Sequence, residues 1–246
     1  METPIYVALS KQSGQLEEMA QVANNLSNVS TTGFRGSHRL FQEYLEDTGK
    51  GQNRNRISFV QDMGDYHNLS QGRLMNTSRS TDLALQGEGY FVIDAPSGKY
   101  YSRNGSFTID PTGRLVNGDG NALLQADGRP ITVPPNQAFT VGEDGSVSYF
   151  NQSTSETVKI GRIAIVKFAD GQDLRQSGGS NFLTDQTPLP SQATVKQGML
   201  EQSNVEPVLE ITNMISLQRS FEMVNQLVQS EHDRLKQAIN KISRSA

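Results

Sequence analysis

The chain has 246 residues, which is enough for one large domain or two modest ones, each with a real core. Its formal net charge of −4 is spread along the sequence and offers no basic surface for nucleic acid or for an anionic membrane. The absence of cysteine excludes a disulfide framework, thiolate metal sites and a cysteine nucleophile.

The first residues do not have the pattern of a cleaved signal peptide. Glu2 is acidic where such a peptide carries Lys or Arg, and the polar residues 10–14 interrupt the apolar run that should follow. No stretch approaches the ~18 apolar residues of a membrane span. If the protein leaves the cytoplasm, we expect export without a cleaved signal.

The N-terminal segment is predicted to be a helix with one apolar stripe. Between Ile5 and Leu26 the stripe advances alternately by four and three residues, and Gln12 is its one polar position. Its members are Ile5, Leu9, Gln12, Leu16, Met19, Ala23 and Leu26. A period of 3.5 residues keeps such a stripe facing a partner helix along its whole length, as in a coiled coil.

The central region is predicted to be rich in β-hairpins. Residues 46–81 are polar and rich in Gly, Asn, Ser and Arg, so we expect an extended connector there, with Ile57–Val60 as its one plausible strand. From Asp82 onward, short apolar runs alternate with Asn-Gly and Asp-Gly pairs, which tolerate the backbone of tight turns. This spacing favours an all-β sandwich or barrel.

A second polar segment, rich in Gly, Ser, Pro and Gln, leads to a C-terminal helix. That helix again carries a stripe with steps of three and four, broken at Glu231, with members Met214, Leu217, Phe221, Val224, Val228, Glu231, Leu235, Ala238 and Ile242. Two interpretations remain open: the two helices pack on the core of their own domain, or their stripes form coiled-coil-like seams with other helices.

The predicted fold class is α+β, with the two terminal helices forming a coiled-coil-like terminal domain around a central all-β domain. The predicted boundaries are 1–45 for the N-terminal helix and its signature, 46–81 for a connector, 82–175 for the β domain, 176–207 for a second connector and 208–246 for the C-terminal helix.

The sequence offers little for catalysis or metal binding. His38, His67 and His232 are isolated, and none has metal-ligand spacing to another histidine or to a carboxylate pair. Gly87-Glu88-Gly89 lacks the third glycine and the following helix of a dinucleotide loop, and residues 177–180 (Ser-Gly-Gly-Ser) lack the lysine of a phosphate loop. Glu143 and Asp144 are expected to belong to a hairpin turn. We therefore expect no catalytic, cofactor or metal site and no enzyme.

Four segments together resemble the rod and hook family of flagellar axial proteins. They are residues 22–35 (VANNLSNVSTTGFR), residues 82–91 with 101–107 and 113–116, residues 197–205 (QGMLEQSNV) and residues 214–222 (MISLQRSFE). Ser27 departs from the usual alanine of the first motif. The opening residues 4–10, residues 41–45 and the chain length are most similar to the proximal-rod members of the family.

The resemblance implies a structural subunit that polymerises through its terminal helices with copies of itself and with other rod proteins. It also implies export by the flagellar type III apparatus and a place in the periplasmic part of the basal body. The assembly interface is then expected to include Leu9, Leu16, Met19, Ala23, Asn24, Asn25, Leu26, Asn28, Gly33, Phe34, Met214, Leu217, Phe221, Val224, Val228 and Leu235.

Two alternatives stay open at this point. One is a distal-rod or hook-type subunit of the same family. The other, from a different class, is a secreted β-domain binding module, such as a carbohydrate or adhesin domain, whose helices only complete the fold.

Overall fold

The computed structural model describes residues 3–48, 55–134, 137–151 and 154–245. The chain is α+β and divides into two compact units, each assembled from segments that are distant in the sequence. The first unit contains Met1–Ser27, Ser37–Tyr66 and Glu206–Ala246, and the second contains Asn28–Gly36 and His67–Val205. None of the helices in the described ranges is long and apolar enough to cross a membrane.

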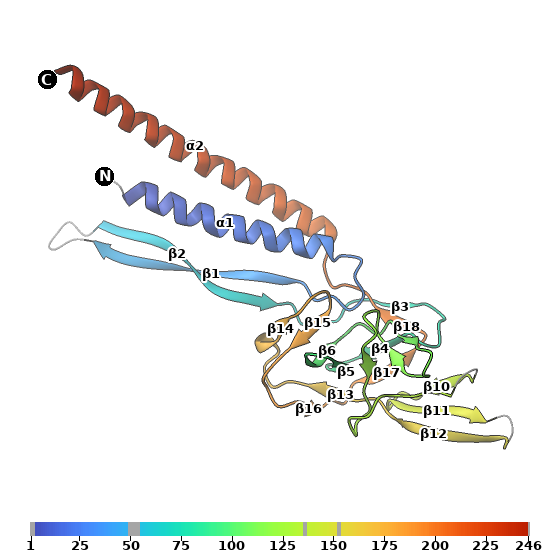
Figure 1. Cartoon of the computed structure of the whole chain (residues 1–246). Helices are drawn as coiled ribbons and strands as arrows, with labels where there is room; N and C mark the ends of the chain where they lie inside the picture. Colours follow the sequence, from blue (N-terminus) through green and yellow to red (C-terminus); the bar gives the residue numbers. More distant parts are fainter. Residues whose placement is uncertain (1–2, 49–54, 135–136, 152–153, 246) are drawn as a thin grey trace. The chain divides into compact units, whose positions relative to one another are not determined.

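The first unit consists of the two terminal helices and a two-stranded ribbon. Helix α1 (Thr3–Ser27) contacts helix α2 (Pro207–Ser245) and strand β1 (Ser37–Thr48), and β1 pairs with β2 (Asn55–His67). In Figure 1 the blue helix α1 lies between α2 and the ribbon. Helix α2 begins at a proline, whose missing N–H is not needed in the first turn of a helix. The expected terminal helices are both present.

The ribbon differs from the extended connector predicted at residues 46–81. Ile57–Val60 lies inside β2, which has 13 residues, and a further short strand, β3 (Leu74–Asn76), follows it. Buried strands are recognised in a sequence by a continuous apolar run, but the strands of a two-stranded ribbon do not need one. The polar composition of residues 46–81 therefore did not indicate the ribbon.

The second unit is a set of short antiparallel strands. Its largest sheet has the order β14-β15-β6-β5-β9-β8-β7, with β13 pairing both β5 and β16. Smaller sheets pair β10-β11-β12, β17-β4 and β18-β3. The bounds are β4 Leu83–Gln86, β5 Tyr90–Ala95, β6 Gly98–Ser102, β7 Thr108–Ile109, β8 Leu115–Val116, β9 Ala122–Leu123, β10 Phe139–Val141, β11 Ser146–Asn151, β12 Glu156–Arg162, β13 Ile165–Lys167, β14 Arg175–Gln176, β15 Asn181–Leu183, β16 Leu189–Pro190, β17 Thr194–Gln197 and β18 Met199–Glu201, with a short 3-10 helix at Gly171–Asp173.

Apolar side chains from these strands form two clusters. The larger cluster is centred on Phe91 and Phe107, whose rings meet edge to face with centroids 5.5 Å apart. The smaller cluster contains Tyr90, Tyr101 and Phe182. Together they give the β unit a core of its own, which the run of apolar strands predicts.

Several of the predicted turn glycines adopt the left-handed backbone. Gly120, Gly128 and Gly145 have φ angles of +79°, +84° and +80°, as an Asp-Gly turn requires. Gly105 serves another purpose, because a Cβ atom there would lie 1.6 Å from the carbonyl oxygen of Leu83. That glycine allows two backbone segments to approach each other.

The second predicted connector, residues 176–207, also differs from expectation, because it contains four strands, β15 to β18. Strand β17 pairs with β4 and β18 pairs with β3, which lie more than a hundred residues earlier in the chain. Such strands are stabilised by pairing with distant segments, and patterns of neighbouring residues in the sequence do not reveal that pairing.

Candidate assembly site

Three of the four sequence motifs converge on one buried ionic cluster in the β unit. Glu201 lies between two arginines, with Oε1 3.0 Å from Nη2 of Arg35 and Oε2 3.2 Å from Nη1 of Arg103. All three side chains are almost completely buried, with 1% exposure at Glu201. The backbone N–H of Gly72 also donates to Glu201 Oε1, at 3.1 Å.

The two arginines are held by further acceptors. Arg35 donates through Nη1 to the carbonyls of Leu69 and Ser70, and Arg103 donates through Nη2 to the carbonyl of Gly87 at 2.6 Å. Burial lowers the pKa of Arg35, and the charge of Glu201 opposes that effect. A buried charge is tolerated only when it is paired and hydrogen-bonded in this way.

Gly33 and Phe34 lie next to Arg35 in the sequence and are packed beside the same ionic cluster. The N–H of Gly33 donates to the backbone carbonyl of Glu201 at 2.7 Å, and its φ angle is +67°. A Cβ atom at Gly33 would lie 2.4 Å from the carbonyl carbon of Arg103. Phe34, with 1% exposure, is fully buried within its own chain.

Asn204 joins the third motif to the first. Its Oδ1 accepts from the N–H of Gly36 at 2.8 Å, and its Nδ2 donates to the carbonyls of Asn68 and Ser70 at 2.8 and 3.0 Å. Its own N–H donates to the carbonyl of Phe34 at 3.3 Å. The motif residues therefore connect distant parts of one chain.

The asparagines of the first motif bond nearby segments, and Nδ2 of Asn25 also donates to Glu210 Oε1 of α2 at 3.4 Å. Asn25 is fully buried, donates to the carbonyl of Ser37 at 2.9 Å and accepts from the N–H of Ser37 at 3.2 Å. Asn28 is half-buried, and its carbonyl and Oδ1 accept from Thr31 at 3.1 and 3.0 Å. Asn24 is exposed, and its carbonyl accepts from Ser27.

On α1, the buried stripe lies one residue N-terminal to the predicted one. Leu9 and Leu16 are 55% and 52% exposed and Ala23 is also exposed, while Met19 and Leu26 are half-buried. Among the side chains of α1 that the structure describes, residues 7–27, the buried ones are Ala8, Gln15, Val22 and Asn25. Gln15 is buried despite its polarity because its Nε2 donates to Ser220 Oγ of α2 at 2.6 Å.

On α2, the predicted stripe is largely covered. Val224 is buried, while Met214, Leu217, Phe221 and Val228 are half-buried. The side chain of Leu235 lies outside the described residues. Other apolar side chains of α2 are exposed and were not singled out in the sequence: Val208, Leu209, Ile211, Ile215, Met223 and Leu227.

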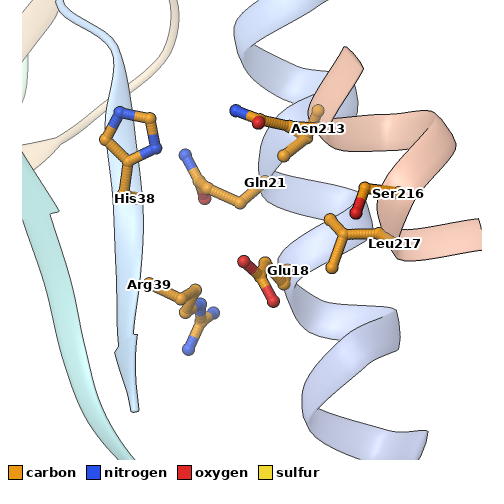
Figure 2. Close-up of a pocket in the computed structure, with 8 residues that line it drawn as sticks. Glu18, Gln21, His38, Arg39, Asn213, Ser216 and Leu217 are labelled. Carbon is orange, nitrogen blue, oxygen red and sulfur yellow. The ribbon is translucent and has the colours of Figure 1, made fainter. Parts of the chain in front are cut away.

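A polar cavity of about 230 Å³ lies among α1, β1 and α2. Figure 2 shows side chains from all three elements pointing toward it: Glu18, Gln21, His38, Arg39, Asn213, Ser216 and Leu217. Burial raises the pKa of the Glu18 carboxyl, and the nearby His38 partly opposes this. Arg39 pairs with Asp65 at 3.1 Å and with Glu17 at 3.7 Å.

The other histidines take no part in that cavity. His67 is buried against the ring of Phe182, and its backbone bonds the side-chain amide of Gln172, while His232 is exposed on α2. Across the described part of the chain, no group of three His, Asp or Glu side chains is placed to hold a metal ion.

The chain matches known proteins over nearly its whole length. It is 34% identical over 249 residues to "Flagellar basal-body rod protein FlgF" of Caulobacter vibrioides, with 99% of both chains covered. It is 33% identical over 242 residues to the FlgF of Salmonella typhimurium, with 94% of both covered. The FlgG of Bacillus subtilis is 31% identical over 258 residues, covering 96% of this chain. The chain belongs to the flagellar basal-body rod protein family.

Three family models match consecutive parts of this rod protein. "Flagella basal body rod protein" matches residues 5–35, "Flagellar hook protein FlgE/F/G D1 domain" matches residues 84–149 and "Flagellar basal body rod FlgEFG protein C-terminal" matches residues 196–241. None of the three describes an enzyme. Arg35 and Glu201 fall in the first and last of these ranges, and their ion pair joins the two regions in space. The family resemblance inferred from the motifs is confirmed.

Proposed function

We propose that this chain is a structural axial subunit of the flagellar rod, of the proximal FlgF type, and not an enzyme. It polymerises with copies of itself and with other rod proteins through its terminal helices. The chain is 34% and 33% identical to two FlgF proteins and 31% identical to an FlgG over a similar share, and the higher identity to FlgF supports the proximal assignment over a distal-rod or hook-type subunit. The same similarity disfavours the alternative of a secreted β-domain binding module.

The observation that carries this proposal is the apolar surface left open on both helices. Leu16 is 52% exposed on α1, and Val208 and Met223 are 77% and 63% exposed on α2. Scattered exposed apolar residues are normal on a monomer, but these recur along two long helices of one unit. Removing such surface from water is the usual driving force of subunit association.

The spacing of the exposed residues suits helix packing. Val208, Ile211 and Ile215 advance by three and four residues and therefore share one face of α2. On α1, Leu9 and Leu16 are seven residues apart and also share a face. We infer that these faces form coiled-coil-like contacts with helices of neighbouring subunits, while Val224 serves the contact between α1 and α2 of one chain.

A rod needs an interface that does not close on itself. Heterologous contacts, in which one patch meets a different patch of the next copy, generate open helical assemblies. The exposed faces of α1 and α2 carry different residues and supply two such patches on one subunit. The assembly stands in the periplasm in this proposal, and subunits reach it through the type III export apparatus without a cleaved signal.

The test replaces one exposed residue of this surface by aspartate. Ile215→Asp should leave the free energy of unfolding within about 0.5 kcal/mol of the native chain, because the position is exposed in the monomer. A carboxylate buried in the assembled interface is unfavourable by several kcal/mol. We expect a chain that folds and is exported, is missing from purified basal bodies and leaves cells non-motile.

Glu222→Gln, at an exposed polar position of the same helix, is the matched control and should assemble normally. Normal occupancy of Ile215→Asp in basal bodies would remove the exposed face of α2 from the proposed interface. Normal motility of cells that lack the chain altogether would refute the function itself.

A further inference from the structure

The β unit contains a second, larger cleft, which lies outside the helix faces proposed for assembly. Its volume is about 540 Å³, within the range of small-ligand sites. Its floor includes Ile93 and Tyr100, which are direct cross-strand partners on β5 and β6. Two glycine-rich turns, residues 117–121 between β8 and β9 and residues 177–181 between β14 and β15, supply its walls.

The turn at residues 177–180 was predicted to be a linker, and the structure places it on this cleft instead. Gly178 and Gly179 have φ angles of +73° and +51°. No atom of the chain lies within 4 Å of where a Cβ atom would stand at either glycine. The carbonyls of Gly178 and Gly179 already accept from the N–H of Asn181 and from Gln176 Nε2, at 3.1 and 2.6 Å, but the space beside both glycines is open to a ligand.

The turn at residues 117–121 and the ring of Tyr100 are each held by hydrogen bonds within the chain. Asn117 Oδ1 accepts from the N–H groups of Asp119 and Asn121, at 3.0 and 2.9 Å. The Tyr100 hydroxyl lies 2.6 Å from Ser97 Oγ, which fixes the end of the ring. A site that is ordered before binding loses less entropy when a ligand arrives.

Other polar groups of the cleft remain available. The structure gives no hydrogen bond, within the described residues, to the side-chain amides of Asn121 and Asn181 or to the Ser177 hydroxyl. An amide carries both donors and an acceptor, and so can bind two neighbouring hydroxyl groups. The lining of the cleft thus combines hydrogen-bond donors and acceptors with an aromatic ring.

The charges at the cleft narrow the choice of ligand. None of its lining residues is Lys, Arg or His, so it lacks the charged donors that make the strongest hydrogen bonds to a phosphate or carboxylate ligand. Asp119 is the single ionisable acid among them, which is too little for a metal ion or a polycation. The negative face of Tyr100 suits the C–H groups of a sugar ring.

We propose that this cleft binds a neutral oligosaccharide. Asn121 and Asn181 bond its hydroxyl groups from the two walls, and Tyr100 packs against one face of a sugar ring. This inference does not depend on the rod function, because the helices of the first unit contribute nothing to the cleft.

The test is an NMR titration of the full-length monomer with N,N′,N″-triacetylchitotriose and, separately, with maltotriose, each up to about 10 mM. We expect saturable shifts of the backbone amides of Gly178, Gly179 and Asn121, with a dissociation constant in the millimolar range or below for at least one sugar. Tyr100→Ala and Asn181→Ala should each weaken binding about fivefold or more. Thr157→Ala, at an exposed position of β12 outside the cleft, should leave it unchanged.

If Tyr100→Ala disturbs strand β6, Asn181→Ala still tests the cleft. A variant counts as folded when its thermal midpoint equals that of the native chain. Absence of saturable shifts with both sugars overturns the proposal. So does binding that neither cleft variant weakens. Tighter binding of inorganic phosphate than of either sugar at these residues would also contradict the assignment to a neutral ligand.

Discussion

Replacing Glu201 by glutamine tests the ionic cluster that joins the sequence motifs. The change keeps the side chain's size and one acceptor oxygen, but it leaves Arg35 and Arg103 as two buried cations without a counter-charge. Breaking a buried ion pair by removing one partner costs about 3–5 kcal/mol. Since whole proteins are stable by about 5–15 kcal/mol, this loss is a large part of the total.

The assay is urea unfolding of the monomer, followed by near-ultraviolet circular dichroism. The chain has no tryptophan, so the packed tyrosines Tyr90 and Tyr101 report on the β unit. With a urea slope of about 2 kcal/mol/M, a loss of 4 kcal/mol moves the midpoint down by about 2 M. Glu143→Gln, which breaks an exposed pair with Lys196, is the control and should have little effect. Equal midpoints for the Glu201 and Glu143 variants would refute the reasoning.

Two further predictions concern the same region. Gly33→Ala should lower the free energy of unfolding by about 2 kcal/mol or more, because backbone strain at positive φ adds to a clash with the backbone of Arg103. Gly128 also has positive φ but has open space around it. Gly128→Ala should therefore lower the free energy of unfolding by a smaller amount, due to strain alone, in the same urea assay. Burial raises the pKa of Tyr90, so the stability that its neutral phenol contributes is fully present below about pH 10 and is lost as the pH rises through the raised value. The thermal midpoint should therefore fall less between about pH 8 and pH 11 in Tyr90→Phe than in the native chain. Equal falls in the two chains would contradict this prediction.

Local chemistry was enough to predict the helices and most of the hairpins. Asp-Gly pairs such as Asp127-Gly128 and Asp144-Gly145 mark turns because their glycines adopt positive φ angles. The apolar spacing from Met214 onward predicts the C-terminal helix, and the expected start at residue 208 lies one residue after the observed start at Pro207. These signals lie within a few residues of the structure that they specify.

The connectors and the buried stripe of α1 were not predictable in the same way. Strands β17 and β18 are short, and they are held by partners more than a hundred residues away. Gln15 is polar and still faces α2, because Ser220 supplies its hydrogen-bond partner, so counting apolar residues selects Leu16 instead. Gly33 was expected in the assembly interface, and its close approach to the backbone of Arg103 is visible only in the three-dimensional arrangement.

The most direct test of the central claim, assembly through exposed helix faces, uses the absence of native cysteine. Single cysteines are introduced as Leu16→Cys, Ile215→Cys and Val224→Cys, and their labelling by a maleimide is compared in the monomer and in purified basal bodies. In the monomer the first two, at exposed positions, should react quickly, whereas the third, at a buried position, should react slowly. In assembled rods, the first two should become protected as well. Fast labelling of Leu16→Cys and Ile215→Cys in assembled rods would contradict the account.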